Sequence, residues 1–553
     1  MRSGLLVLAL SGGITVALLT VVVGEQRAEL RQPTNTWVKR SPLAHTPPSP
    51  RLGYEGACVW DSKHRVMIRY GGHNQGGGGE QHSEVWTFDP LTAKWTLQEP
   101  NTSPPGLCCG QQNVFDPVQG RYIRFPSFSG SHGWQWWREI YLNDSSVWTY
   151  DLATNLWRNM RPLPTPRLAP LRCAAWDAEE QVVVVFGGEG SREGTLVYDP
   201  YTNEWKRMNP KTQPAFRSGG NMAYDAARRV HILFGAQFTD DPHTWAYDLK
   251  KNEWRDLKPA TMPPTNQNDA VLTYDPINRV VLAVVKVTQS RNGDGAVHRL
   301  ETWAYDAGAN QWTKMNPPQE PDPSGNRARQ LMFAPELNLA ILENRTHPPQ
   351  GPHEQQIWTY RYAEGQPAPP PPPRARSQSP LVEDVVVSVL SPQQVEVSWR
   401  APDAKDVGGY HVERAPVEVL TEDQLTRLKS RTPPLPEPSV GAIRRIGQFT
   451  RLTASPVQGT SFTDTTVDLT KPQIIAGEPI DQRTFSPAQL DENGKPYRFA
   501  VYAYRVRAVN ARGAMSGASP AFFTIPAAPQ WVFAKEDGTT CHLKWAANLE
   551  KGI

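Results

Sequence analysis

One cassette of residues recurs six times along the chain, and this repetition constrains the fold more than any other feature. Its first part is an apolar–aromatic–Asp step followed by a β-rich run, as in CVWDSKHRVMIRY from Cys58. Its second part is an aromatic-x-aromatic-Asp step that ends on a tryptophan, as in VWTYDLATNLW, which ends at Trp157. The spacing of the first-part aromatics runs from 48 residues (Trp176 to Tyr224) to 61 residues (Phe115 to Trp176). The six first-part aromatics are Trp60, Phe115, Trp176, Tyr224, Tyr274 and Phe333.

A period near 50 residues with four strands per unit is typical of β-propellers. The sequence therefore predicts an all-β protein in which residues 31–365 form a six-bladed propeller. The sixth unit lacks its tryptophan after Tyr360, whereas an unmatched tryptophan, Trp37, precedes the first unit. We therefore expect residues 34–40 to form the outer strand of the sixth blade and to pair with residues 356–362. Such closure removes the exposed edge of an open sheet.

The aromatic-Asp and tryptophan positions resemble those of kelch-repeat, galactose-oxidase-like propellers over roughly residues 34–362. The Gly-Gly doublet of the kelch pattern is present at Gly71-Gly72 and Gly187-Gly188, reduced to Gly235-Ala236, and absent from the other three units. The resemblance implies a kelch-type propeller. It also raises copper oxidase chemistry, which in galactose oxidase needs a cysteine cross-linked to a tyrosine, an axial tyrosine and two histidines. None of the five cysteines lies in a matching motif.

The composition changes after the propeller. Residues 366–380 form a proline-rich linker. Residues 381–528 resemble a fibronectin type III β-sandwich with insertions, through Trp399 and the pattern Tyr504-x-Val506-x-Ala508. A capping box at Thr421–Gln424 predicts a short helix in the first insertion. Residues 529–553 repeat the opening of the sandwich, with Trp545 in place of Trp399, and predict a truncated second copy, so the chain is expected to be a fragment or a truncated product.

The N-terminus predicts export. Arg2 precedes an apolar stretch from Leu5 to Val23, so residues 1–30 are expected to be a signal peptide or a membrane anchor. The protein is then either secreted or held outside the cytoplasm by this segment. Its formal net charge of +3 and its lack of a Lys/Arg-rich run give no indication of a nucleic-acid partner. The five cysteines fit no disulfide framework, although Cys108-Cys109 could form a vicinal disulfide or remain two thiols.

Long segments that join the second to the third strand of each unit are expected on one face of the propeller, where binding residues usually lie. The second unit carries three tryptophans in four residues followed by Arg and Tyr, a composition suited to stacking on sugar rings or anchoring a protein. The same tryptophans could instead pack their own loop against the blade. The predicted ligand-binding residues are Trp134, Trp136, Trp137, Arg138, Tyr141, His73 and His82.

Three functions remain open at this stage. The leading hypothesis is an exported, non-enzymatic binding protein whose long-loop face contacts a glycan or protein partner. The second is a carbohydrate-active or copper-dependent oxidase-like enzyme on the same face, and the third is a structural surface module. The histidines and carboxylates of these loops lack metal-site spacing, so the sequence predicts no metal, no cofactor and no catalytic residue.

Overall fold

The structure is a computed structural model, and the part of the chain that it describes is entirely β, without a helix. Within that part, no helix is long and apolar enough to cross a membrane. The segment 1–29 and the predicted helix at Thr421–Gln424 lie outside the described residues. The described residues are 30–41, 56–72, 84–104, 112–125, 147–163, 166, 168, 171–188, 194–236, 243–264, 270–346, 354–365, 380–419, 443–470, 478–479, 501–524, 532–545 and 550–551, without 102, 218, 293–294, 404 and 538.

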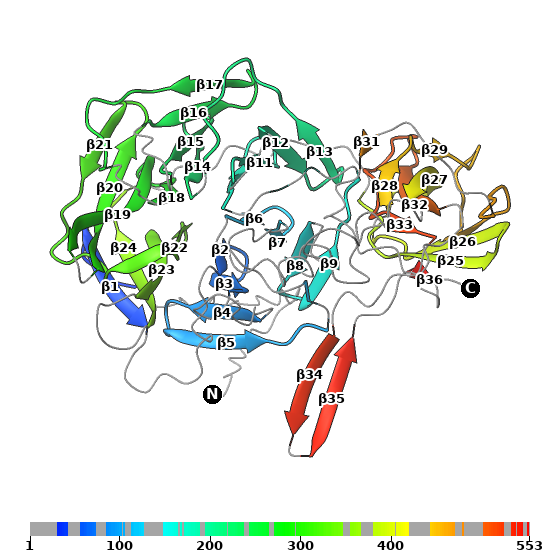
Figure 1. The fold of residues 1–553 in the computed structure, drawn as a ribbon, viewed down its shortest axis with the longest axis horizontal. Helices are drawn as coiled ribbons and strands as arrows, with labels where there is room; N and C mark the ends of the chain where they lie inside the picture. The colour runs from blue at the N-terminus through cyan, green and yellow to red at the C-terminus, as the bar shows by residue number, and fades with distance from the viewer. Residues whose placement is uncertain are drawn as a thin grey trace, which may run out of the picture.

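Six four-stranded antiparallel sheets are built from residues 36–361. Figure 1 shows them around a ring, with the first strand of each sheet toward the centre and the fourth at the rim. We call them the first to sixth sheets, and the whole set the ring. In order, the sheets comprise β2 (Ala57–Asp61), β3 (Val66–Tyr70), β4 (Val85–Asp89) and β5 (Lys94–Gln98); β6 (Val114–Asp116), β7 (Arg121–Arg124), β8 (Trp148–Asp151) and β9 (Leu156–Asn159); β10 (Cys173–Asp177), β11 (Val182–Phe186), β12 (Thr195–Asp199) and β13 (Glu204–Arg207); β14 (Asn221–Asp225), β15 (Val230–Phe234), β16 (Trp245–Asp248) and β17 (Glu253–Asp256); β18 (Ala270–Asp275), β19 (Val280–Asn292), β20 (Gly295–Asp306) and β21 (Gln311–Lys314); and β22 (Ser324–Ala334), β23 (Leu339–Thr346), β24 (Gln355–Arg361) and β1 (Thr36–Ser41).

The sixth sheet is completed by the N-terminal strand. β1 pairs antiparallel with β24, with Thr36 opposite Arg361 and Trp37 opposite Tyr360. The pairing predicted from the unmatched Trp37 is therefore present. β1 precedes the first sheet in the sequence, whereas β24 is the last strand of the ring, so the hydrogen bonds between them join the two ends of the ring. β24 then has a neighbouring strand on both sides.

An aromatic pair between the third and fourth strands recurs in all six sheets. The ring centroids of each pair are 4.9 or 5.0 Å apart, within the range of favourable aromatic contacts. The two residues of each pair lie directly opposite each other in the strand register, which explains why the aromatic-Asp step and the tryptophan keep a fixed spacing. The pairs are Phe88–Trp95, Tyr150–Trp157, Tyr198–Trp205, Tyr247–Trp254, Tyr305–Trp312 and Tyr360–Trp37.

In five sheets the third-strand aromatic of this pair is a tyrosine. Its hydroxyl donates to the asparagine that immediately precedes the fourth strand, at 2.7 to 2.9 Å. Each asparagine has a positive φ, a conformation that asparagine tolerates better than most residues. Asn252 also donates through Nδ2 to the Met208 carbonyl of the preceding sheet at 2.6 Å. The first sheet has Phe88 and Ala93 at the two positions, so it lacks both the hydroxyl and the amide.

The outer tryptophans also tie neighbouring sheets together. Trp254, Trp312 and Trp37 donate through Nε1 to a threonine hydroxyl on the third strand of the preceding sheet or just before it, at 2.7 to 2.9 Å. At the equivalent position before Trp205 stands Val147, which has no hydroxyl. The Nε1 atom of Trp205 is correspondingly buried without a hydrogen-bond partner. The threonines are Thr195, Thr244 and Thr302.

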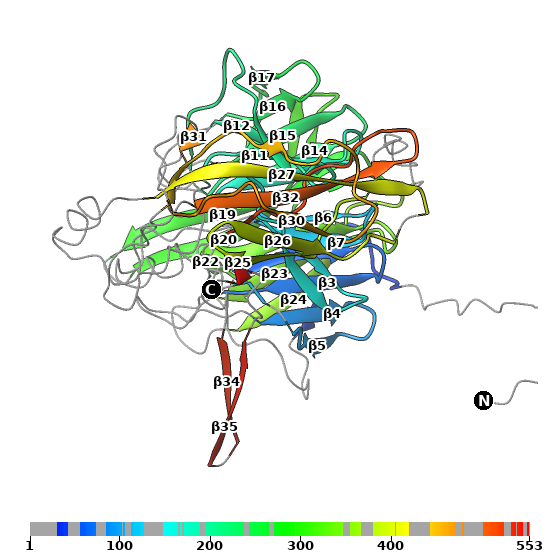
Figure 2. The same ribbon diagram turned by 90° about the vertical axis from the view of Figure 1, so that its right-hand side faces the viewer.

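The described residues between 380 and 524, together with β36, form two further sheets, which we call the C-terminal unit. Their inner faces share a core in which Trp399 makes an edge contact with Tyr410, with ring centroids 5.2 Å apart. A separate hairpin projects away from both parts in Figures 1 and 2. The four-stranded sheet has the order β30 (Ser461–Asp464), β26 (Gln394–Trp399), β25 (Val385–Ser391) and β36 (Glu550–Lys551); the six-stranded sheet comprises β31 (Glu478–Pro479), β28 (Ile443–Ile446), β27 (Val407–Val419), β32 (Val501–Asn510) and β33 (Phe522–Phe523), with β29 (Thr450–Arg451) on β27; and the hairpin is β34 (Val532–Asp537) and β35 (Thr540–Trp545).

Candidate functional site

The ring has two ends of different character. At one end, which we call the short-turn end, tight turns join the first strand to the second and the third to the fourth. Aspartates shape these turns: Asp61 Oδ1, for example, accepts hydrogen bonds from the backbone N–H groups of Lys63 and His64 at 2.9 and 3.0 Å. At the opposite end, the loop-bearing end, the second strand of each sheet is connected to the third, and the chain passes from one sheet to the next.

The predicted ligand-binding residues belong to two segments of the loop-bearing end. His73 and His82 lie between β3 and β4, and the tryptophan-rich segment 134–141 lies between β7 and β8. All seven residues, Trp134, Trp136, Trp137, Arg138, Tyr141, His73 and His82, fall outside the described residues, as does the Cys108-Cys109 pair. The structure describes the strands from which these two segments start: β3 ends at Tyr70 and β7 ends at Arg124. We call the described residues at this end of the ring the base of the loop-bearing end.

In the fifth sheet, the segment 288–300 is one of the long connections between second and third strands that were expected to be loops, and its described residues extend the sheet. β19 and β20 continue as a hairpin through the interval 288–300, with Thr288 opposite His298. His298 Nδ1 lies 3.2 Å from the Thr288 hydroxyl, so this histidine interacts with its own hairpin. The sequence carries no sign of strands here, because the residues of β19 that follow Val287 are polar and resemble those of a loop. Strands that extend beyond a packed core need no apolar face.

The base of the loop-bearing end contains buried basic side chains, each exposed by no more than 4%. They lie at the end of the second strand or near the start of the first strand of a sheet, so they come together beneath the loops. Two guanidinium groups lie over aromatic rings: Arg124 over Tyr70 at 5.3 Å and Arg172 over Phe125 at 5.4 Å from the ring centroids. The buried basic residues are Arg69, Arg124, Arg172, Arg217, Lys286, Arg329 and Arg345.

One buried ion pair connects the first and sixth sheets in this base. Arg69 Nε donates to Glu343 Oε1 at 2.7 Å, and both side chains are almost fully buried. Gln355 also donates to Glu343. Burial and the neighbouring Glu343 carboxylate raise the pKa of the Cys58 thiol well above its usual value, so this cysteine is a neutral thiol at physiological pH.

A second buried thiol has the same character. Burial raises the pKa of Cys173 to about 12, although the nearby Arg217 and Arg172 act in the opposite direction. A neutral thiol is a poor nucleophile and a poor metal ligand. Cys58 and Cys173 are therefore buried, neutral thiols, and neither is an activated nucleophile.

An exposed aromatic side chain is present beside this base and was missed by the sequence reasoning. Phe216 lies in the connection from β13 to β14, is 43% exposed, and stacks on Phe186 with centroids 6.3 Å apart and ring planes 24° from parallel. The neighbouring Arg217 is buried. Phe216 lies outside the repeated cassette, so no periodic signal pointed to it.

The described residues contain no group of three or more His, Cys, Asp or Glu side chains placed to hold a metal ion. The described base combines buried basic side chains, one of them paired with Glu343, with the exposed ring of Phe216. Such groups bind by stacking, cation–π contact and hydrogen bonding. No protein-family model matches the sequence, and no curated protein matches it significantly.

Proposed function

We propose that this chain is an exported, non-enzymatic binding protein in which a six-bladed kelch-type β-propeller, residues 31–365, contacts a glycan or protein partner through its loop-bearing end. In this proposal a fibronectin type III-like sandwich follows at residues 381–528. Six antiparallel four-stranded sheets around a ring, closed by β1, support the propeller assignment. The apolar segment 5–23 supports export.

The observation that carries the functional proposal is the difference between the two ends of the ring. The short-turn end is built from the same tight, aspartate-shaped turn in sheet after sheet. The segments that join the second to the third strands at the other end differ in length and sequence. The described base from which they start contains buried cations, with Phe216 exposed beside it. Variable segments on a rigid scaffold are where binding residues concentrate.

A glycan array tests the proposal. The full chain is compared with a variant in which Trp134, Trp136 and Trp137 are changed to Ala. A matched control removes exposed apolar side chains elsewhere, with Val118→Ala and Leu390→Ala. Each of these residues is 51% exposed; Val118 lies in the tight turn between β6 and β7, and Leu390 lies in β25 of the C-terminal unit. We expect saturable binding by the full chain and by the control, and its loss in the tryptophan variant.

Other outcomes separate the remaining functions. Binding that persists in the tryptophan variant excludes these residues as the platform. Absence of glycan binding by all three proteins removes the carbohydrate proposal and leaves a protein partner or a structural role. Conversion of a bound glycan to product, measured on the same array hits in solution, would replace the binding function by an enzymatic one.

A further inference from the structure

The second sheet departs from the repeat at one position. The first residue of the second strand is apolar in the other five sheets, but in the second sheet it is Arg121. Burial alone would lower the pKa of this guanidinium, and the Glu383 carboxylate more than offsets that effect, so the pKa of Arg121 is raised. The five apolar residues are Val66, Val182, Val230, Val280 and Leu339.

Glu383 belongs to the C-terminal unit, just before β25. It accepts a hydrogen bond from Arg121 and forms a second ion pair with Arg158 Nε at 3.0 Å. Leu381, two residues earlier, packs against the apolar cluster between the second and third sheets. The start of the C-terminal unit is thus fixed to the second sheet by one carboxylate shared between two arginines and by one apolar side chain.

The third sheet makes a second contact through its outer turn. The Ala518 N–H donates to the Thr202 carbonyl at 3.1 Å. A Cβ atom on Gly517 would lie 2.3 Å from Thr202 Cα, so only glycine permits this approach of the two backbones. The segment that follows β32 therefore matches the shape of this turn.

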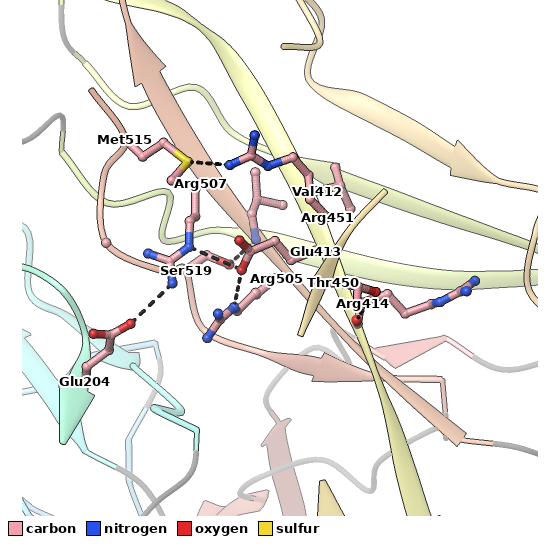
Figure 3. Close-up of polar contacts among 12 residues, drawn as sticks. Glu204, Val412, Glu413, Arg414, Thr450, Arg451, Arg505, Arg507, Met515 and Ser519 are labelled. Atoms are coloured by element: carbon pink, nitrogen blue, oxygen red, sulfur yellow. Dashed lines mark hydrogen bonds and ion pairs between the residues drawn. The ribbon is translucent and has the colours of Figure 1, made fainter. Parts of the chain in front are cut away.

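Ion pairs add to the backbone contact, and Figure 3 shows those that link Arg507 to Glu204 and to Glu413. Arg507 bonds Glu204 of β13 through Nη2 at 3.2 Å and Glu413 of β27 through Nε at 3.2 Å. Arg505 Nε donates to the same Glu413 oxygen at 2.6 Å. Burial alone would raise the pKa of Glu413, but Arg505 and Arg507 outweigh it and lower that pKa, so Glu413 stays charged and holds Arg507 toward the ring.

A third contact is made by Arg161, which follows β9 and is buried. Its guanidinium lies over the rings of Phe522 and Phe523 of β33, at 4.5 and 5.6 Å from the centroids. A cavity of about 740 Å³ lies beside Glu383 between the two parts. The contact therefore consists of discrete polar and cation–π clusters rather than one continuous apolar surface.

We propose that the second and third sheets carry a dedicated docking surface whose partner is the C-terminal unit of the same chain, and that Arg121 and Arg158 select the site by binding Glu383. The surface is formed by these two arginines, Arg161 and the turn Thr202–Glu204. It holds the C-terminal unit at a fixed angle to the loop-bearing end. This inference is independent of the ligand proposed for that end.

Restoring the repeat tests this docking surface. Arg121→Val introduces the residue found at the equivalent position in four of the other five sheets. Arg158→Thr introduces the residue that follows the fourth-strand tryptophan in two other sheets, Thr96 and Thr313. The double variant should keep the ring folded while releasing the C-terminal unit. Hydrogen exchange of peptides containing the Ala518 amide is expected to become faster on the order of tenfold, and the radius of gyration from solution scattering is expected to rise.

A second variant acts from the other side of the contact. Gly517→Ala places a methyl group against Thr202 and should produce the same two changes. Lys250→Gln serves as the control, because Lys250 pairs with Glu179 at 2.5 Å between the third and fourth sheets of the ring. Unchanged exchange at Ala518 and unchanged scattering in both docking variants would overturn the proposal, as would an equal change in the control.

Discussion

Replacing Thr244 by valine isolates one bond between neighbouring sheets. Thr244 Oγ1 accepts a hydrogen bond from Trp312 Nε1 at 2.9 Å, and Thr244 is fully buried. Valine has nearly the same shape, so the packing changes little while the indole N–H loses its acceptor. A buried donor left without a partner costs about 1–3 kcal/mol. We therefore expect Thr244→Val to lower the free energy of unfolding by about 1–3 kcal/mol.

In the second sheet the opposite substitution, valine to threonine, can be made at the equivalent position. Val147 occupies the equivalent position, and the Trp205 Nε1 atom that would reach a hydroxyl there is buried without a partner. Val147→Thr supplies the acceptor, although it also buries a hydroxyl. We expect its effect to lie between zero and a gain of about 1 kcal/mol. Urea unfolding, followed by tryptophan fluorescence, measures both variants. A loss below about 0.3 kcal/mol in Thr244→Val, or an equal loss in Val147→Thr, would refute the reasoning.

Three further predictions concern other contacts. Tyr247→Phe removes the hydroxyl that donates to Asn252 at 2.9 Å, and it should lower the free energy of unfolding by about 0.5–1.5 kcal/mol in the same urea assay. An unchanged free energy of unfolding would mean that this hydrogen bond does not stabilise the fold. The pKa of Glu413 is lowered from 4.5 in the folded protein, so its contribution to stability is present above that pH and is lost as the pH falls below it. Glu413→Gln should therefore flatten the dependence of the unfolding free energy on pH below about 4.5. An unchanged slope would contradict this. A thiol reagent applied to the folded protein should modify the exposed Cys541 and spare the buried Cys173, as mass spectrometry of the peptides would show; early labelling of Cys173 would contradict its burial.

The repeat predicted much of the ring because its signals are local. An aspartate that shapes a turn and two aromatics that face each other across neighbouring strands must keep fixed spacings, so six copies show the pattern clearly. Trp37 could be assigned to the sixth sheet since only one sheet lacked its tryptophan. The hairpin of β19 and β20 was missed because its extension past Val287 carries polar residues typical of a loop.

The docking contacts could not be predicted from local patterns. Arg121 is visible in the sequence as a break in a row of apolar residues, but its partner Glu383 is 262 residues away. The buried basic residues likewise carry no local signal of burial in the sequence, because arginine and lysine are usually exposed. The tryptophan-rich segment 134–141 and His73 and His82 remain predictions, since they lie outside the described residues.

Closure of the ring by its N-terminal strand is the claim on which the account depends most, and Trp37 tests it directly. Trp37 pairs with Tyr360 and donates to Thr302 at 2.7 Å, just as Trp312 pairs with Tyr305 and donates to Thr244. The measurement is the free energy of unfolding of Trp37→Ala beside that of Trp312→Ala. Equal losses of about 3–5 kcal/mol are predicted for two equivalent core tryptophans. A loss below about 1 kcal/mol for Trp37→Ala, with the full loss for Trp312→Ala, would contradict closure by β1.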